Sequence, residues 1–61
     1  MSAYSLRLHY INGGAPVEEP LDVTDEAAAR ELAQVRLLLT RDYSRVELHR
    51  GDRPLDVFAR D

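Results

Sequence analysis

Among the side chains of this chain, those of its two histidines are best suited to acid–base or metal chemistry. His9 and His49 lie in segments that alternate like strands, and the carboxylates of Glu18, Glu47 and Asp56 lie in segments that could neighbour them. Metal-binding histidines usually sit in short motifs with other ligands, and no His-x-His pair or short His/Asp cluster occurs here. We therefore expect both to be surface histidines, and we predict no metal and no other cofactor.

The chain offers no evident catalytic nucleophile. It has no cysteine, and Ser2, Ser5 and Ser44 stand in no recognisable triad context. Gly13-Gly14 does not follow a strand and open a helix, as a phosphate-binding loop would require. A chain of 61 residues also has little room for a deep pocket. We predict that the protein is not an enzyme.

The tripeptide Arg50-Gly51-Asp52 is known as a cell-adhesion signal, but it also lies between two alternating segments, 44–50 and 53–60. Gly51-Asp52 suits a two-residue type II′ turn, which favours glycine at its first position. The adhesion interpretation needs an extracellular protein, and nothing in the sequence suggests export. We interpret the tripeptide as the bend of a hairpin.

This hairpin has a predicted register that places apolar side chains together. A two-residue turn sets facing residues on the two strands, and a slip by one residue would send them to opposite faces. The predicted pairs are Arg50 with Arg53, Leu48 with Leu55, Val46 with Val57, and Glu47 beside Asp56 as a like-charge neighbour.

An earlier hairpin is predicted around Asn12-Gly13. Residues 4–11 alternate apolar and polar side chains, which is typical of a half-buried strand. Asn-Gly is the strongest short signal for a two-residue hairpin loop, and this loop sets Leu8 opposite Val17 and Arg7 opposite Glu18. Because Pro16 and Pro20 have no N–H to donate, we expect the returning segment to be an irregular edge strand.

The segment 23–42 predicts the one helix. Thr24 or Asp25 can cap its first turn, where Asp25 and Glu26 also complement the helix dipole. At about 100° per residue, one stripe toward the sheet contains Ala28, Leu32, Val35 and Leu39. Leu37 falls almost opposite that stripe. It is either an ordinary exposed leucine or a residue that contacts a second subunit.

The predicted architecture is therefore an α+β fold with the order ββαββ, formed by residues 1–61 as a single domain. A four-stranded, mainly antiparallel sheet packs one helix on one face. Its other face either binds a partner or is simply solvated, and both interpretations stay open. The residues that could bind a partner there, at the basic hairpin tip or on the helix are Arg7, His9, Ile11, Leu37, Arg45, His49, Arg50, Arg53, Phe58 and Arg60.

Composition narrows the choice of partner. The net charge is −3, which argues against general nucleic-acid binding. All eight basic residues are arginine, which we interpret as the codon usage of a GC-rich genome and not as a functional choice. No segment approaches the run of about 18 apolar residues needed to span a membrane, and the N-terminus does not look like a signal peptide. We expect a cytoplasmic protein.

Three segments resemble a group of short uncharacterised bacterial proteins with a ββαββ plan, classed as a domain of unknown function. These segments are LRLHYINGG, VEEPLDVTDEAAARELA and SRVELHRGDRPL. The chain departs from the pattern at VEEP, where an acidic stretch ending in glycine is expected. The resemblance implies the ββαββ fold and brings no activity and no functional residues.

The sequence thus predicts a non-catalytic protein-interaction module, self-associating as a homodimer or acting as a subunit of a larger assembly. A 61-residue chain without disulfides has a thin core, and a partner would bury additional apolar area. The open sheet face and the sheet edges are the expected contact surfaces. The alternative is a small antitoxin-like or repressor-like regulator that contacts nucleic acid through its surface arginines.

Overall fold

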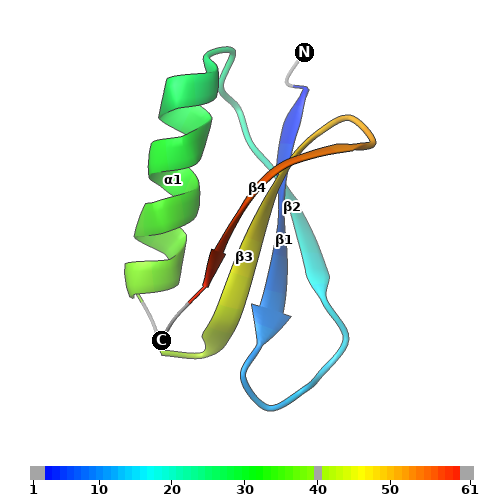
Figure 1. Ribbon diagram of the computed structural model, residues 1–61, viewed down its shortest axis with the longest axis vertical. Helices are drawn as coiled ribbons and strands as arrows, with labels where there is room; N and C mark the ends of the chain where they lie inside the picture. The colour runs from blue at the N-terminus through cyan, green and yellow to red at the C-terminus, as the bar shows by residue number, and fades with distance from the viewer. Residues whose placement is uncertain (1–2, 40, 60–61) are drawn as a thin grey trace.

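The computed structural model describes residues 3–39 and 41–59. Its elements are β1 (Tyr4–Tyr10), β2 (Val17–Pro20), α1 (Glu26–Leu39), β3 (Tyr43–Arg50) and β4 (Arg53–Ala59). The strands form one sheet in the order β2-β1-β3-β4, each neighbour antiparallel, and α1 packs on one face (Figure 1). The predicted α+β class and ββαββ topology are confirmed.

The first hairpin has the predicted register, although its turn differs. Arg7 lies opposite Glu18 and Leu8 opposite Val17, as expected. The Gly13 N–H donates to the Tyr10 carbonyl at 3.2 Å, and Gly13 has a φ of 81°, whereas Asn12 has a negative φ. The Asn12 side chain instead accepts from the Gly14 N–H at 3.0 Å, so the turn begins one residue earlier than predicted.

The second hairpin confirms the turn and corrects the register beyond it. Gly51 has a φ of 59°, Asp52 a negative φ, and Arg50 lies opposite Arg53, as a type II′ turn requires. A β-bulge then adds one residue to β4. The expected pairs of Leu48 with Leu55 and Val46 with Val57 are wrong, because the register places Leu48 opposite Asp56 and Val46 opposite Phe58.

The bulge has a packing reason. Without it, Leu55 and Phe58 would point to opposite faces of the sheet, because successive side chains alternate. The extra residue lets both of them pack against the core, and Val57 is turned to the other face instead. Phe58 was predicted on the open face, and this prediction is wrong. A large aromatic ring gains more from burial than a valine does.

Helix α1 begins as predicted but buries a different stripe. Asp25 caps it, since the Ala28 N–H donates to Asp25 Oδ2 at 3.1 Å. The buried residues are Ala29, Ala33 and Leu37, and Leu37 is only 7% exposed. The predicted stripe faces away from the core to a large extent, with Leu32, Val35 and Leu39 all exposed.

The orientation of α1 follows from side-chain size. Two alanines four residues apart let a helix backbone approach a sheet closely, whereas leucines at those positions would hold it away. Beneath α1, the side chains of Leu6, Val46 and Leu48 are completely buried. The exposure predicted for Leu37 is wrong, because this residue closes the same stripe one turn further along.

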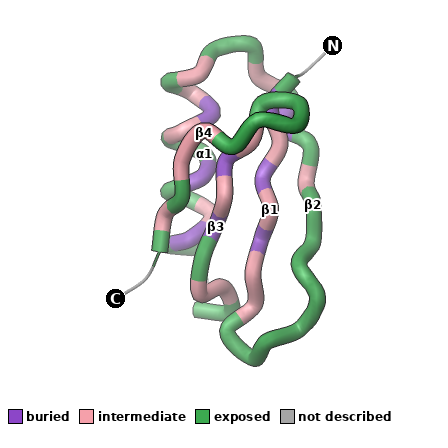
Figure 2. The backbone as a smooth tube through the Cα atoms, turned by 45° about the vertical axis from the view of Figure 1, so that its right-hand side comes forward, coloured by how far each residue is buried: buried purple, intermediate pink, exposed green. Residues whose placement is uncertain are grey.

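The core lies between α1 and the middle of the sheet. Figure 2 shows the buried positions on β1, β3 and the inner side of α1, while β2 at the far edge is mostly exposed. The buried residues are Tyr4, Leu6, Leu8, Leu21, Ala29, Ala33, Leu37, Val46 and Leu48.

Ion pairs connect α1 to both edge strands. Arg36 Nη2 lies 2.9 Å from Glu19 of β2, and the Arg30 guanidinium donates to Asp56 of β4. Each pair is partly exposed, so each contributes little to stability alone. In the part of the chain that the structure describes, no helix combines the length and the apolar content needed to cross a bilayer.

Candidate interaction surfaces

One face of the sheet carries no helix, and we call it the open face. Three strands place charged or imidazole side chains on it, and β4 places small apolar ones there. Its members are Ser5, Arg7 and His9 from β1, Glu18 from β2, Arg45, Glu47 and His49 from β3, and Val57 and Ala59 from β4.

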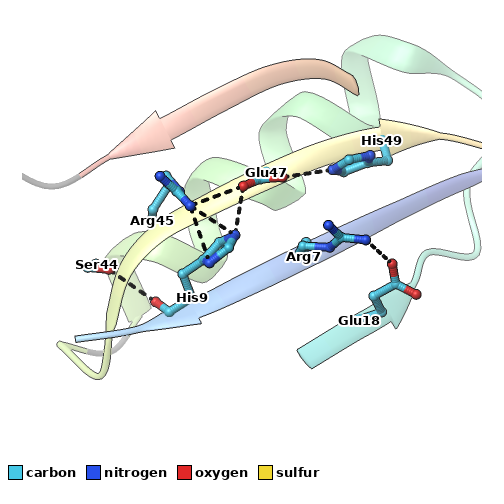
Figure 3. Close-up of polar contacts among 7 residues, drawn as sticks. All are labelled: Arg7, His9, Glu18, Ser44, Arg45, Glu47 and His49. Atoms are coloured by element: carbon cyan, nitrogen blue, oxygen red, sulfur yellow. Dashed lines mark hydrogen bonds and ion pairs between the residues drawn. The ribbon is translucent and has the colours of Figure 1, made fainter. Parts of the chain in front are cut away.

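Glu47 is the centre of the open face. Each of its two carboxylate oxygens lies within hydrogen-bond distance of the Nε2 atom of a histidine, at 2.7 Å from His9 and at 3.0 Å from His49 (Figure 3). Arg45 Nη2 lies 3.3 Å away on the same strand. The Glu47 side chain is only 18% exposed. It is a shielded carboxylate with three nitrogen-bearing neighbours.

These neighbours set the charge state of Glu47. The hydrogen bond from His49 lowers the pKa of the Glu47 carboxyl most; burial opposes it, and the bond from His9 and the charge of Arg45 act with it. The net result is a pKa below the ordinary value of 4.5. Glu47 is therefore ionised at neutral pH.

The other charges of the open face are also paired. Arg7 Nη2 lies 2.8 Å from Glu18 Oε1 across the first hairpin, and this hydrogen bond lowers the pKa of Glu18 (Figure 3). Arg45 Nη2 also lies 3.4 Å from the ring nitrogens of His9. Among the described residues of the open face, two arginines therefore face two glutamates, and these four charges balance.

The structure brings together four of the residues predicted to bind a partner. Arg7, His9, Arg45 and His49 share the open face, as the alternation of β1 and β3 predicted. Ile11 lies beyond the end of β1, exposed in the turn, where its N–H donates to the Asp42 carbonyl at 2.8 Å.

The remaining predicted residues lie elsewhere. Phe58 packs on the helix side, and Leu37 is buried. Arg50 and Arg53 face each other at the tip of the second hairpin, where the Arg50 guanidinium lies 5.7 Å from the Tyr4 ring centroid. Arg60 is outside the described residues.

Asp56 does not neighbour Glu47 as predicted. The bulge moves it to the helix side of β4, where Asp56 Oδ2 accepts from Arg30. Its other oxygen, Oδ1, accepts from the Val57 N–H at 2.8 Å. The like-charge pair expected from the sequence is therefore replaced by a carboxylate held by α1 and by its own strand.

A second surface was not identified from the sequence. A groove of about 340 Å³ runs between the C-terminal half of α1 and the end of β4, and Leu38, one of the residues that line it, is 75% exposed. Val35 is also exposed, one helical turn before Leu38. The run of leucines at positions 37–39 was the feature of the sequence that could have indicated this surface. We define the α1–β4 surface as Gln34, Val35, Leu37, Leu38, Val57, Phe58 and Ala59.

Chemically, the two surfaces differ. Within residues 3–39 and 41–59, no group of three or more His, Cys, Asp or Glu side chains is arranged to hold a metal ion. The groove has an apolar lining with the amide of Gln34 as its polar side chain.

Comparison with protein-family models, curated proteins and solved structures gave no match.

Proposed function

We propose that this domain is a non-catalytic protein-interaction module that associates with a second copy of itself through the α1–β4 surface. The observation that carries the proposal is Leu38, a leucine 75% exposed beside an apolar groove. Isolated exposed leucines are common, but one that adjoins a hollow lined by apolar side chains is typical of a contact site.

Self-association explains why the projecting side chain and the groove share one surface. A twofold axis brings the same patch of both subunits together, so each copy supplies what the other receives. Leu38 of one copy would enter the groove of the other, and the reverse contact would form at the same time. The exposed Val35 would lie at the margin of this contact.

Size gives a second argument. The chain exposes 4330 Å² in total, and its completely buried large side chains are Leu6, Val46 and Leu48. A standard interface covers about 800 Å² of each partner, a substantial share of so small a surface. Dimerisation would therefore add apolar burial that a domain of this length lacks by itself.

The same geometry supports a role without catalysis. The groove is lined by side chains that do not titrate near neutral pH, so it offers no general acid or base. On the open face, both histidines direct Nε2 at one carboxylate. Among the described residues of the open face, these three side chains are therefore engaged with one another.

Charge does not favour the nucleic-acid alternative. Arg7 is engaged by Glu18 and Arg45 by Glu47, so two of the expected phosphate contacts are already neutralised. Phe58, which was predicted on the open face, packs on the helix side, away from these arginines. The cytoplasmic location and the relation to short bacterial ββαββ proteins stay predictions from the sequence.

Sedimentation velocity over a range of micromolar concentrations tests the proposal. The wild-type chain should sediment as a dimer, and Leu38→Glu should shift it to a folded monomer. Val17→Ser is the matched control, because Val17 is 44% exposed on β2, at the opposite edge of the sheet. A wild-type chain that stays monomeric, or a Leu38→Glu chain that still dimerises, would contradict the proposal.

A further inference from the structure

The outer edges of the sheet follow from its hydrogen-bond pattern. The Gly51 N–H donates to the Ala3 carbonyl at 2.8 Å, so odd-numbered residues of β3 direct their backbone groups at β1. Residues of β4 that lie opposite them must direct theirs outward. These residues are Pro54, Val57 and Ala59.

The same reasoning applies to β2. The Leu21 N–H donates to the Tyr4 carbonyl at 2.9 Å, so the backbone groups of Val17 and Glu19 face β1, and those of Glu18 and Pro20 face outward. Pro20 is one of these outward positions, and Pro16 occupies the next in this alternation. Because proline has no N–H, the β2 edge offers few donors to another strand.

On the β4 edge, the outward N–H groups are kept from pairing with another strand in a different way. Pro54 has no N–H to offer, and the Val57 N–H is already donated to Asp56 Oδ1 at 2.8 Å. Asp56 is held in place twice, by the bulge at Leu55 and by the guanidinium of Arg30 on α1. Of the three outward positions on β4, Pro54 lacks an N–H and Val57 donates its N–H to Asp56. Neither of these reasons applies to the N–H of Ala59.

We propose that Asp56 closes the β4 edge, and that without its carboxylate this edge pairs antiparallel with β4 of a second copy. A twofold axis at Val57 would let each copy donate its Val57 N–H to the Val57 carbonyl of the other. The neighbouring Phe58 and Ala59 are uncharged, so no like-charge contact opposes this pairing. Asp56 therefore confines association to side-chain contacts and prevents extension of the sheet.

The β4 edge shares Val57, Phe58 and Ala59 with the α1–β4 surface, but it would pair through backbone groups and the proposed dimer through side chains, and the experiment separates the two. Asp56→Ala, Asp56→Asn and Arg30→Ala are each made in a Leu38→Glu background, in which the proposed dimer does not form. The amide oxygen of Asp56→Asn can still accept from Val57, and Arg30→Ala leaves the Asp56–Val57 bond intact. Sedimentation velocity measures association, and amide exchange of Val57 and Ala59 at low and high protein concentration locates it.

The expected result is association of the Asp56→Ala chain alone, with slowed exchange of Val57 and Ala59 that depends on concentration. Two new backbone hydrogen bonds predict an association constant raised by about tenfold or more. Equal association of Arg30→Ala would overturn the inference. In that case the Arg30–Asp56 ion pair, and not the hydrogen bond from the Val57 N–H to Asp56, would prevent β4 from pairing with a second copy. A folded Asp56→Ala chain with unchanged association would also overturn it.

A second variant keeps the test decisive if Asp56→Ala does not fold. Asp56→Val removes the same acceptor from the Val57 N–H and introduces a residue of high β propensity. This chain should also associate more strongly than the Leu38→Glu parent, with slowed exchange of the Val57 amide. N-methylation of Val57, which chemical synthesis of so short a chain allows, should abolish association of Asp56→Ala. Asp56→Val without any gain in association, or N-methylation without effect, would contradict the inference.

Discussion

Replacing Glu47 with glutamine tests whether the centre of the open face stabilises the fold. The carboxylate accepts from His9 at 2.7 Å and from His49 at 3.0 Å, and it is 18% exposed. A hydrogen bond to a charged group contributes about 1.5–3 kcal/mol when buried, and less where water reaches it. Glutamine keeps one acceptor oxygen and loses the charge. We expect Glu47→Gln to lower the free energy of unfolding by about 1–2 kcal/mol at pH 7.

The stability difference between the wild type and Glu47→Gln should depend on pH in a defined direction. The pKa of Glu47 is lowered in the folded state, so its contribution is fully present above its ordinary value of 4.5. It is lost as the pH falls through the lower folded value, because the protonated acid then resembles glutamine. The difference between the wild type and Glu47→Gln should therefore shrink toward zero on acidification. Other carboxyl groups titrate in both proteins and cancel in this difference.

Thermal and urea unfolding at pH 7 and at about pH 3 measure the effect. A loss of 1 kcal/mol lowers the melting temperature of a domain of this size by about 4–8 °C. Glu18→Gln is the control, because Glu18 is paired with Arg7 but is well exposed, and it should change little. An equal loss at both pH values, or none at pH 7, would refute the assignment of Glu47 as the stabilising carboxylate.

Three further substitutions probe the fold, each measured by urea unfolding. Leu37→Ala should remove about 2–5 kcal/mol, as expected for a buried leucine, whereas Leu38→Ala beside it should have little effect on the monomer; the reverse order would contradict the orientation of α1. Asp25→Ala should cost about 1 kcal/mol through loss of the helix cap, and Asp25→Ser should recover most of it. Gly51→Ala should cost about 1 kcal/mol, because alanine tolerates a φ of 59° poorly, and a neutral result would argue against the type II′ turn.

The elements of this fold were readable because their signals are local. Alternation over residues 4–10 predicts β1, and the Asp25 cap predicts the start of α1. The glycine at position 51 predicts the turn of the second hairpin. Each signal involves residues close in the chain, so the physics that produces it is contained in a short segment.

The errors arose where two elements compete for the same core. The β4 alternation favoured Val57 on the core side, and only a sheet already covered by α1 makes burial of Phe58 preferable. Likewise, the leucines of α1 outweigh Ala29 and Ala33 in any count of hydrophobicity, yet the alanines face the sheet. Size matching between facing surfaces decided both outcomes.

The candidate surfaces show the same division. The sequence placed Arg7, His9, Arg45 and His49 on one face, because alternation alone decides which face a strand residue takes. It did not place Glu47 between the two histidines, since that arrangement depends on how β1 lies against β3. The α1–β4 surface was missed for a related reason, because the rotation of α1 determines which leucine is exposed.

The sequence by itself determined the order of the strands and helix along the chain, the turn of the second hairpin and the alternating faces of β1 and β3, because hydrogen bonding and sterics between near neighbours are sufficient for these. Only the tertiary structure decided the bulge in β4, the rotation of α1 and therefore the surface that stays exposed. Those choices depend on how the facing surfaces of separate elements match in size, and no short segment contains that information.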